Sequence, residues 1–241
     1  MTEGHRIILT RQRDRNKIWA ARLEAAGYAV VEAPLIRYES LPVDHDLDAS
    51  AFDWILFTSP QGVKAFTAAG FVPGDARMGA LGAGTADALK TAGLRDDLGA
   101  RTLDGAEFAQ AFLAKISGGG RVLLPGPDRR LPDPRASLSA AGFEVTELPL
   151  YKTCSVPAKE LPTVEFAPGD IVFFCSPSTV RAFTEAWNER PRCVAIGETT
   201  ARASRPAGFE TVVAATPDLS AMVLAAGLDP LPEPATPEME S

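Results

Sequence analysis

Two short stretches of the sequence place a serine and a proline directly after an apolar run. They are DWILFTSPQGVKAF, which starts at Asp53, and DIVFFCSPSTVRAF, which starts at Asp170. Serine is a favoured N-cap and proline fits the first helical position, so each pair predicts the start of a helix. The first N–H groups of a helix lack partners within it, and the helix dipole favours an anion there. Ser59 and Ser176 therefore predict two anion-binding turns, each with a hydroxyl.

Two other apolar runs end in turns that carry threonine. A glycine-rich turn with Thr85 follows the first run, and a turn with Thr199 and Thr200 follows the second. We expect the helix after the first run to begin near Thr85, so that its hydroxyl also lies at a helix start. A single hydroxyl of this kind is more often a cap than a ligand contact, but four equivalent turns together favour anion binding.

A further pair of turns fits the same chemistry. Gly126 lies in the turn LPGPDRR, and Thr10 with Arg11 occupies the corresponding place near the N-terminus. Backbone N–H groups in such turns and the guanidinium of arginine both suit carboxylates or phosphates. These residues extend the predicted site to a ligand with several negative charges.

The second half of the sequence repeats the first. At a shift of 115 residues Arg6–Leu9 aligns with Arg121–Leu124, and at a shift of 117 Asp53–Thr67 aligns with Asp170–Thr184. The shift then returns to 115 for the threonine-bearing turns. Because the order is preserved with a slip of only two residues, the pattern predicts a tandem internal duplication.

Each copy alternates apolar, strand-like runs with amphipathic segments. In the first copy the expected strands are Arg6–Leu9, Ala29–Ala33, Trp54–Thr58 and Met78–Leu81. Strands that alternate with helices predict an α/β fold, with two doubly wound parallel-sheet domains. Ligands bind outside the carboxyl ends of the strands in such sheets. All the turns described above therefore belong at the binding edge.

Composition excludes several classes of function. The net charge of −7 over 241 residues argues against nucleic acid or a membrane surface as a partner. No apolar stretch reaches the length of a membrane span, and the N-terminal residues do not resemble a signal peptide. The 3 cysteines have no metal-ligand spacing, and the 2 histidines lie in polar stretches. We therefore expect a cytoplasmic protein without a metal site.

Two other classes of protein stay open from the residues alone. The run LGAGTA resembles a dinucleotide-binding turn only in part, because the third glycine is replaced and no acidic residue follows at the usual place. A nucleotide-dependent transferase would need such signatures. The main alternative is a non-enzymatic two-domain binding protein for a small polyanionic ligand.

An ordered set of motifs resembles the uroporphyrinogen-III synthase family. The motifs are LTR, ILFTSPQGV, GAGTA, AAGFEVTELPLYKT, VFFCSPSTV and VAIGETTARA. The resemblance extends in the family's order from Ile7 to about Gly227. The resemblance implies an enzyme of tetrapyrrole biosynthesis, a cyclising hydro-lyase. It would close hydroxymethylbilane to uroporphyrinogen III, with inversion of ring D and loss of water, and without a cofactor.

The resemblance also implies how the chain is divided. Two α/β domains would be joined by a two-stranded linker that the chain crosses twice. One domain would be discontinuous, and each would combine strands from both copies of the repeat. The composition of the C-terminal segment predicts a disordered tail. The expected ranges are 1–35 with 153–228 for the discontinuous domain, 39–149 for the other, 36–38 and 150–152 for the linker, and 229–241 for the tail.

The family's tyrosine falls on Tyr151, which the resemblance makes a weak acid near the leaving hydroxymethyl oxygen. Glu198 departs from this picture, because it places a negative charge near a predicted carboxylate site. Its side chain should therefore point away from the site, or the substrate contact there is Thr200 rather than Thr199. We expect a monomer that binds hydroxymethylbilane and contacts hydroxymethylbilane synthase transiently. Which hydroxyl meets which carboxylate stays open. The expected substrate contacts are Thr10, Arg11, Ser59, Thr85, Gly126, Ser176, Pro177, Thr199 and Thr200.

Overall fold

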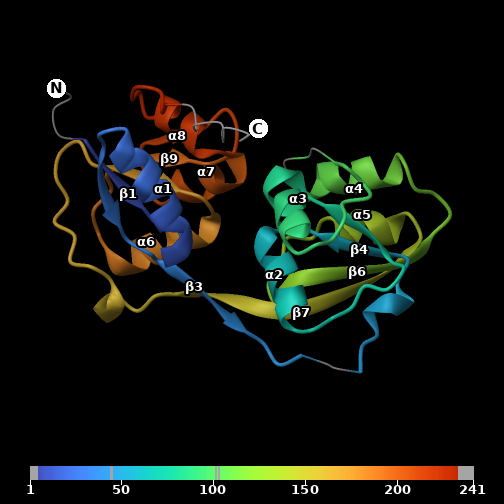
Figure 1. Cartoon of the computed structure of the whole chain (residues 1–241). Helices are drawn as coiled ribbons and strands as arrows, with labels where there is room; N and C mark the ends of the chain where they lie inside the picture. Colours follow the sequence, from blue (N-terminus) through green and yellow to red (C-terminus); the bar gives the residue numbers. More distant parts are fainter. Residues whose placement is uncertain (1–4, 44–45, 101, 103, 233–241) are drawn as a thin grey trace, which may run out of the picture. The chain divides into compact units, whose positions relative to one another are not determined.

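The computed structural model divides the chain into two compact units, each with its own five-stranded sheet (Figure 1). The units are Met1–Arg37 with Thr153–Ser241, and Tyr38–Lys152. The first unit is therefore built from both ends of the chain. The residues that the structure describes are 5–43, 46–100, 102 and 104–232.

The sheet of the first unit has the strand order β10-β9-β8-β1-β2, and every neighbouring pair is parallel. The strand that follows β1 in the sequence, β2, pairs with one edge of β1, and the later strand β8 pairs with its other edge. The point where the order reverses therefore lies between β1 and β8, where α/β sheets bind ligands. The strands are β1 (Arg6–Leu9), β2 (Ala29–Glu32), β8 (Ile171–Phe174), β9 (Arg192–Ala195) and β10 (Thr211–Val213).

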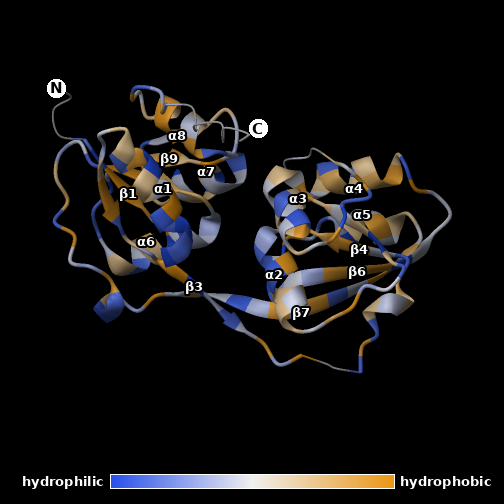
Figure 2. Ribbon diagram, viewed as in Figure 1, coloured by the Kyte–Doolittle hydropathy of each residue, from blue (hydrophilic) through white to orange (hydrophobic). Residues whose placement is uncertain are grey.

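Helices cover both faces of this sheet, because successive side chains of a strand point to opposite faces. Ile7 and Leu9 pack with α1 and α8, whereas Ile8 packs with α6. Figure 2 shows β1 in the colour of hydrophobic residues. The helices of the unit are α1 (Arg13–Ala25), α6 (Pro177–Ala186), α7 (Glu198–Ser204) and α8 (Leu219–Ala225), with the short 3-10 helix η2 (Ala158–Glu160).

The sheet of the second unit has the order β3-β7-β6-β4-β5. Strands β4, β5, β6 and β7 pair in parallel, and the order reverses between β4 and β6. The strands are β3 (Ile36–Ser40), β4 (Trp54–Phe57), β5 (Arg77–Ala80), β6 (Gly120–Pro127) and β7 (Phe143–Ser155). The helices are α2 (Pro60–Ala68), α3 (Gly82–Thr91), α4 (Gly105–Leu113) and α5 (Arg135–Ala140), with the 3-10 helix η1 (Ala49–Ala51).

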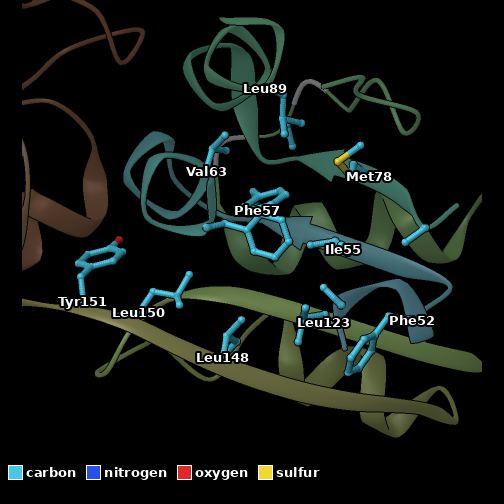
Figure 3. Close-up of a cluster of buried hydrophobic side chains, with 14 residues drawn as sticks. Phe52, Ile55, Phe57, Val63, Met78, Leu89, Leu123, Leu148, Leu150 and Tyr151 are labelled. Carbon is cyan, nitrogen blue, oxygen red and sulfur yellow. The ribbon is translucent and has the colours of Figure 1, made fainter. Parts of the chain in front are cut away.

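This second sheet is also covered on both faces. Phe57 of β4 packs with α2 and α3 on one face, and Leu56 packs with α4 and α5 on the other. Figure 3 shows the first of these clusters, with Leu150 and Tyr151 of β7 at its margin. Because both faces of β4 are covered, its residues form a continuous apolar run.

The second sheet is mixed, whereas the sequence predicted only parallel strands. Leu41 N donates to Leu150 O at 2.9 Å, and Val156 N donates to Leu35 O at 2.8 Å. Along the β3 side the residue number rises from 35 to 41, while the number of the partner residue on the β7 side falls from 156 to 150. The two strands are therefore antiparallel. Residues 36–38 and 150–152, the expected linker, thus lie in this strand pair. The unit boundaries fall at residues 37/38 and 152/153.

The start of the predicted disordered tail is packed. The Tyr28 hydroxyl donates to the Asp229 carbonyl at 2.7 Å, and Leu231 packs against the core of the first unit. These two contacts order residues 229–232, which composition alone did not reveal. The rest of the predicted tail, residues 233–241, lies outside the described residues. Within the described part of the chain, no helix has both the length and the apolar character needed to cross a membrane.

Candidate functional site

Ser59 caps α2 at the carboxyl end of β4, beside the point where the strand order reverses. Its Oγ accepts a hydrogen bond from Gly62 N at 3.0 Å, and Pro60 occupies the first turn. Gly62 faces the end of β6, because a Cβ there would lie 3.2 Å from the Pro125 carbonyl oxygen. The N-terminus of α2 is thus held against the strand end that carries Gly126.

Tyr151 of β7 meets this helix start. Its hydroxyl lies 3.1 Å from Ser59 Oγ, and either oxygen can donate. The residue is 4% exposed, and its ring makes an edge contact with Tyr38 at 5.0 Å between centroids. The Tyr151 carbonyl accepts from Asp128 N at 2.9 Å. The phenol is therefore held at one position at the carboxyl edge of the sheet.

The threonine-bearing turn of this unit differs from the expected one. Helix α3 begins at Gly82 rather than near Thr85, and Leu81 at its N-cap makes no side-chain cap. Gly82 has a φ of 73°, which glycine adopts without strain, so the helix starts directly after the strand. Thr85 is consequently buried in the first turn at 2% exposure, and it is not a capping hydroxyl.

In the first unit Ser176 and Pro177 begin α6 in the way that Ser59 and Pro60 begin α2. Ser176 Oγ accepts from Thr179 N at 3.3 Å and lies 2.8 Å from Ser178 Oγ. Ser176 and Pro177 are partly exposed. The Ser-Pro prediction of a capped helix is therefore confirmed in both units.

Thr10 and Arg11 lie across the reversal point from this helix, after β1. The Thr10 hydroxyl is fully buried and donates to the Phe173 carbonyl at 2.7 Å, so it joins β1 to β8. Arg11 stacks its guanidinium 4.3 Å from the ring centroid of Trp19. Arg11 is thus the polar group of this pair whose side chain reaches the surface of the unit.

Gly197, rather than a threonine, is the N-cap of α7. Thr200 is 3% exposed and Thr199 is exposed, so of the two hydroxyls only that of Thr199 is accessible. Glu198 Oε1 accepts from Arg205 Nη1 at 2.7 Å, and this hydrogen bond lowers the pKa of Glu198. The charge that departed from the expected pattern is therefore neutralised along its own helix.

Each unit thus presents its expected residues at one edge of its own sheet. Ser59, Gly126 and Tyr151 gather at the carboxyl edge of the second unit. Thr10, Arg11, Ser176, Pro177, Thr199 and Thr200 follow three neighbouring strands of the first unit, β1, β8 and β9. The capped helix starts offer unpaired N–H groups to carboxylates.

Sequence reasoning left Arg130 unassigned, although it belongs to the same edge. Its Nε donates to the Pro127 carbonyl at 3.0 Å, and Nη2 donates to the Leu148 carbonyl at 3.2 Å. Burial lowers the pKa of Arg130, while the charges of Glu147 and Tyr151 act in the opposite direction. The proline-rich turn concealed this residue, since its contacts depend on how β6 and β7 align.

Cys175 does not supply a nucleophile to the first unit. Burial raises the pKa of its thiol to about 11, although the charge of Arg11 opposes the rise. The thiolate needed for attack is therefore scarce at neutral pH. The described part of the chain also holds no group of three or more His, Cys, Asp or Glu side chains that could bind a metal ion.

The fold defines a class: α/β proteins with parallel sheets, whose ligands generally bind outside the carboxyl ends of the strands. A family model described as uroporphyrinogen-III synthase HemD matches residues 17–224. The chain belongs to the uroporphyrinogen-III synthase family, and it is an enzyme of this kind rather than the binding protein considered as an alternative.

Known relatives agree with this assignment. The chloroplastic uroporphyrinogen-III synthase of Oryza sativa subsp. japonica is 29% identical over 233 residues, which cover 86% of this chain and 74% of that protein. The porphyrin biosynthesis protein HemD of Ruminiclostridium josui is 25% identical over 239 residues, and the match spans 91% of this chain but 47% of that protein.

The fold is shared with solved structures. The crystal structure of uroporphyrinogen-III synthetase from Helicobacter pylori matches with a TM-score of 0.66 and 19% identity, over 92% of this chain and 98% of that one. A mutant uroporphyrinogen III synthase from Thermus thermophilus matches with a TM-score of 0.59 and 22% identity, over 93% and 96%. The α/β architecture with parallel sheets is therefore confirmed.

Proposed function

We propose that this chain closes hydroxymethylbilane into uroporphyrinogen III, with inversion of ring D and loss of water. The observation that carries the proposal, beside family membership, is the 3.1 Å contact between the Tyr151 hydroxyl and Ser59 Oγ. It holds a weak acid beside a helix start that favours carboxylates. The linear substrate carries eight carboxylates on its pyrroles, so it needs both features.

Tyr151 is the proposed acid of the first step. The carbon–oxygen bond of the terminal hydroxymethyl group breaks, the phenol donates its proton to the departing oxygen, and water leaves. An azafulvene cation is left on the substrate. General acid catalysis of this kind contributes about 10²–10⁴-fold to a rate. In the proposed arrangement Ser59 Oγ accepts from Gly62 N–H and donates its own proton to the Tyr151 oxygen, which leaves the phenol proton for the substrate.

The ring closure that follows depends on position rather than on covalent help. The substituted carbon of ring D attacks the cation and forms a spiro intermediate, whereas unguided closure gives the type I isomer. Holding the reacting carbons in the right geometry contributes several kcal/mol, on the order of 7–11, to such a step. The carboxylates are the handles by which the rings are held. The residues proposed to hold them are Thr10, Arg11, Ser59, Thr85, Gly126, Ser176, Pro177, Thr199 and Thr200.

These contacts differ in kind. Ser59, Ser176 and Thr199 offer accessible or partly exposed hydroxyls at helix starts. Thr10, Thr85 and Thr200 are buried, so their proposed part is to shape the turns while backbone N–H groups meet the ligand. Both α2, with 9 residues, and α6, with 10, are long enough for a substantial dipole.

We propose further that the two compact units are two domains which arose by tandem duplication and exchanged strands. Arg6 of the first copy pairs with Asp170 of the second in one unit. In the other unit their repeat partners meet, because Arg121 N donates to Asp53 Oδ2 at 2.8 Å. Each unit therefore combines the first strand of one copy with a later strand of the other. The strand pair β3 and β7 is the proposed two-stranded linker.

The proposed setting is a cytoplasmic monomer that meets hydroxymethylbilane synthase only transiently and needs no nucleic acid, membrane or cofactor. The negative net charge of −7 supports the absence of nucleic acid and of an anionic membrane surface as partners. Light scattering of the purified chain measures its molar mass in solution, which tests the proposed monomer. Cross-linking with and without hydroxymethylbilane tests the transient contact.

An isomer assay tests the function directly. Purified protein is given freshly prepared hydroxymethylbilane, and the products are oxidised to porphyrins and separated by chromatography. We expect type III uroporphyrin as the main product and type I in a control without protein. Type I alone in both samples would overturn the proposal. Tight binding of the substrate without turnover would instead favour the binding-protein alternative.

A further inference from the structure

A cavity of about 390 Å³ opens at the end of β6 in the second unit, and arginines dominate its lining. Arg129, Arg130 and Arg135 contribute three positive charges, and Asp128 and Glu147 contribute two negative ones. We call this cavity the arginine pocket. Its net positive charge is notable in a chain whose net charge is −7. It therefore favours an anionic occupant.

Arg130 forms the fixed wall of the arginine pocket. Its side chain is 13% exposed, and two backbone carbonyls, Pro127 O and Leu148 O, accept from it. A Cβ on Gly126 would lie only 3.3 Å from Arg130 Nη2, so the glycine leaves room for this guanidinium. A cation held in place in this way loses little conformational entropy when a ligand binds.

Glu147 satisfies the arginines only partly. Its two carboxylate oxygens lie 3.8 Å from Arg130 Nε and 4.0 Å from Arg135 Nε. Both distances exceed those of hydrogen bonds, although the charges still attract. A carboxylate from a ligand could approach both guanidinium groups more closely. Burial, which lowers the pKa of Arg130, makes such a partner more favourable.

One part of the lining of the arginine pocket is apolar. Leu131, which lines it, is a large hydrophobic side chain that is 68% exposed. Guanidinium groups also stack on flat aromatic rings. Another cavity of this unit, of about 310 Å³, is lined by Asp46 and Asp48 and by no arginine. Of these two cavities in the described part of the chain, the arginine pocket is the one that combines cations with an apolar surface.

We propose that the arginine pocket binds one carboxylate-bearing pyrrole ring, with the carboxylate between Arg130 and Arg135 and the ring against Leu131. The volume suits a ring-sized group. This inference rests on the proposed function, because it names the part of the substrate that the second unit holds. Arg130 also lies within electrostatic reach of Tyr151, so the bound ring is close to the proposed acid.

The probe for this site is a monopyrrole with one acetate and one propionate side chain, titrated by calorimetry into the full chain. Arg129→Gln/Arg135→Gln should weaken its binding about tenfold, since the charge-assisted contact to Arg135 and the neighbouring positive charge of Arg129 are lost. Glu147→Gln should tighten binding about threefold, because it removes the competing carboxylate. Lys90→Gln/Arg95→Gln changes the net charge equally at exposed positions outside the pocket, and it should bind like wild type.

The arginine variant should weaken binding and Glu147→Gln should tighten it. If these residues only stabilised the fold, the two substitutions would not change binding in opposite directions. The inference is overturned if the monopyrrole does not bind wild type, if the double arginine variant binds as tightly as wild type, or if Glu147→Gln weakens binding. The isomer assay on wild type separates this inference from the proposed function. Type III product together with unchanged binding in the arginine variants would overturn the pocket alone.

Discussion

The Tyr151 hydroxyl has a function separable from that of its ring. The ring is buried and contacts Tyr38, while the hydroxyl contacts Ser59 Oγ at 3.1 Å. Tyr151→Phe keeps the ring and removes the acid. We expect turnover to fall by about 10²-fold or more, with KM changed less than turnover, because carboxylate contacts are retained. Steady-state kinetics on hydroxymethylbilane, with the product isomer determined, measures both.

Tyr28→Phe is the matched control, since it also removes one phenol hydroxyl. Tyr28 lies in the first unit and donates to the Asp229 carbonyl at the surface. Its loss should leave turnover and the product isomer unchanged. Equal turnover by Tyr151→Phe and wild type would remove Tyr151 from the mechanism while leaving the family assignment in place.

Helices α2 and α6 allow the capping role of a serine to be separated from its chemical role. Glycine replaces an N-cap serine at a cost of only a few tenths of a kcal/mol, so Ser59→Gly and Ser176→Gly should unfold almost like wild type. Ser59→Gly also removes the hydroxyl that contacts Tyr151. We therefore expect its turnover to fall about tenfold, the value of one hydrogen bond. Denaturant unfolding and kinetics are the measurements.

Ser59→Thr supplies the rescue, because threonine caps the helix and keeps a hydroxyl. Its turnover should return close to wild type. Ser176→Gly removes a cap whose Oγ neighbours Ser178 rather than a tyrosine, so any effect should lie in KM. A fall in turnover that Ser59→Thr does not restore would contradict an orienting role for the Ser59 hydroxyl.

How much of these elements the sequence could predict depends on how local their causes are. The Ser-Pro starts of α2 and α6 follow from neighbouring residues, and they are where the pattern placed them. The predicted start of α3 near Thr85 was wrong. Gly82 adopts a backbone φ of 73°, and with this turn the helix begins directly after the strand. Arg130 could not be assigned, since its partners depend on the pairing of β6 with β7.

At the scale of the whole molecule, the stability of the first unit depends on contacts between distant parts of the chain. The buried Asp170 carboxylate accepts from Arg6 Nε at 2.9 Å, from Arg6 Nη2 at 2.7 Å and from Ala167 N at 2.9 Å. Burial alone would raise the pKa of Asp170, but these hydrogen bonds outweigh it and lower the pKa. The pair joins the starts of β1 and β8, and its two residues are 164 positions apart in the sequence.

Asp170→Asn should therefore lower the free energy of unfolding by about 2 kcal/mol at pH 7, the value of charge-assisted hydrogen bonds discounted for the partly exposed arginine. A lowered carboxyl pKa gives stability that is full above the unfolded value, near 4, and is lost as pH falls through the folded value. The difference between wild type and variant should shrink over that acidic range. Urea unfolding at several pH values measures it.

Asp53→Asn is the matched control, because Asp53 is the repeat partner of Asp170 but is exposed and accepts from the Arg121 backbone N–H. Its loss should cost less than about 1 kcal/mol, and it should act on the second unit. Peptide-resolved hydrogen exchange shows which unit each of the two variants, Asp170→Asn and Asp53→Asn, destabilises. Asp170→Asn should speed exchange in β1 and β8 together, although they lie near opposite ends of the sequence. Faster exchange in β8 alone would contradict a first unit held together by this pair.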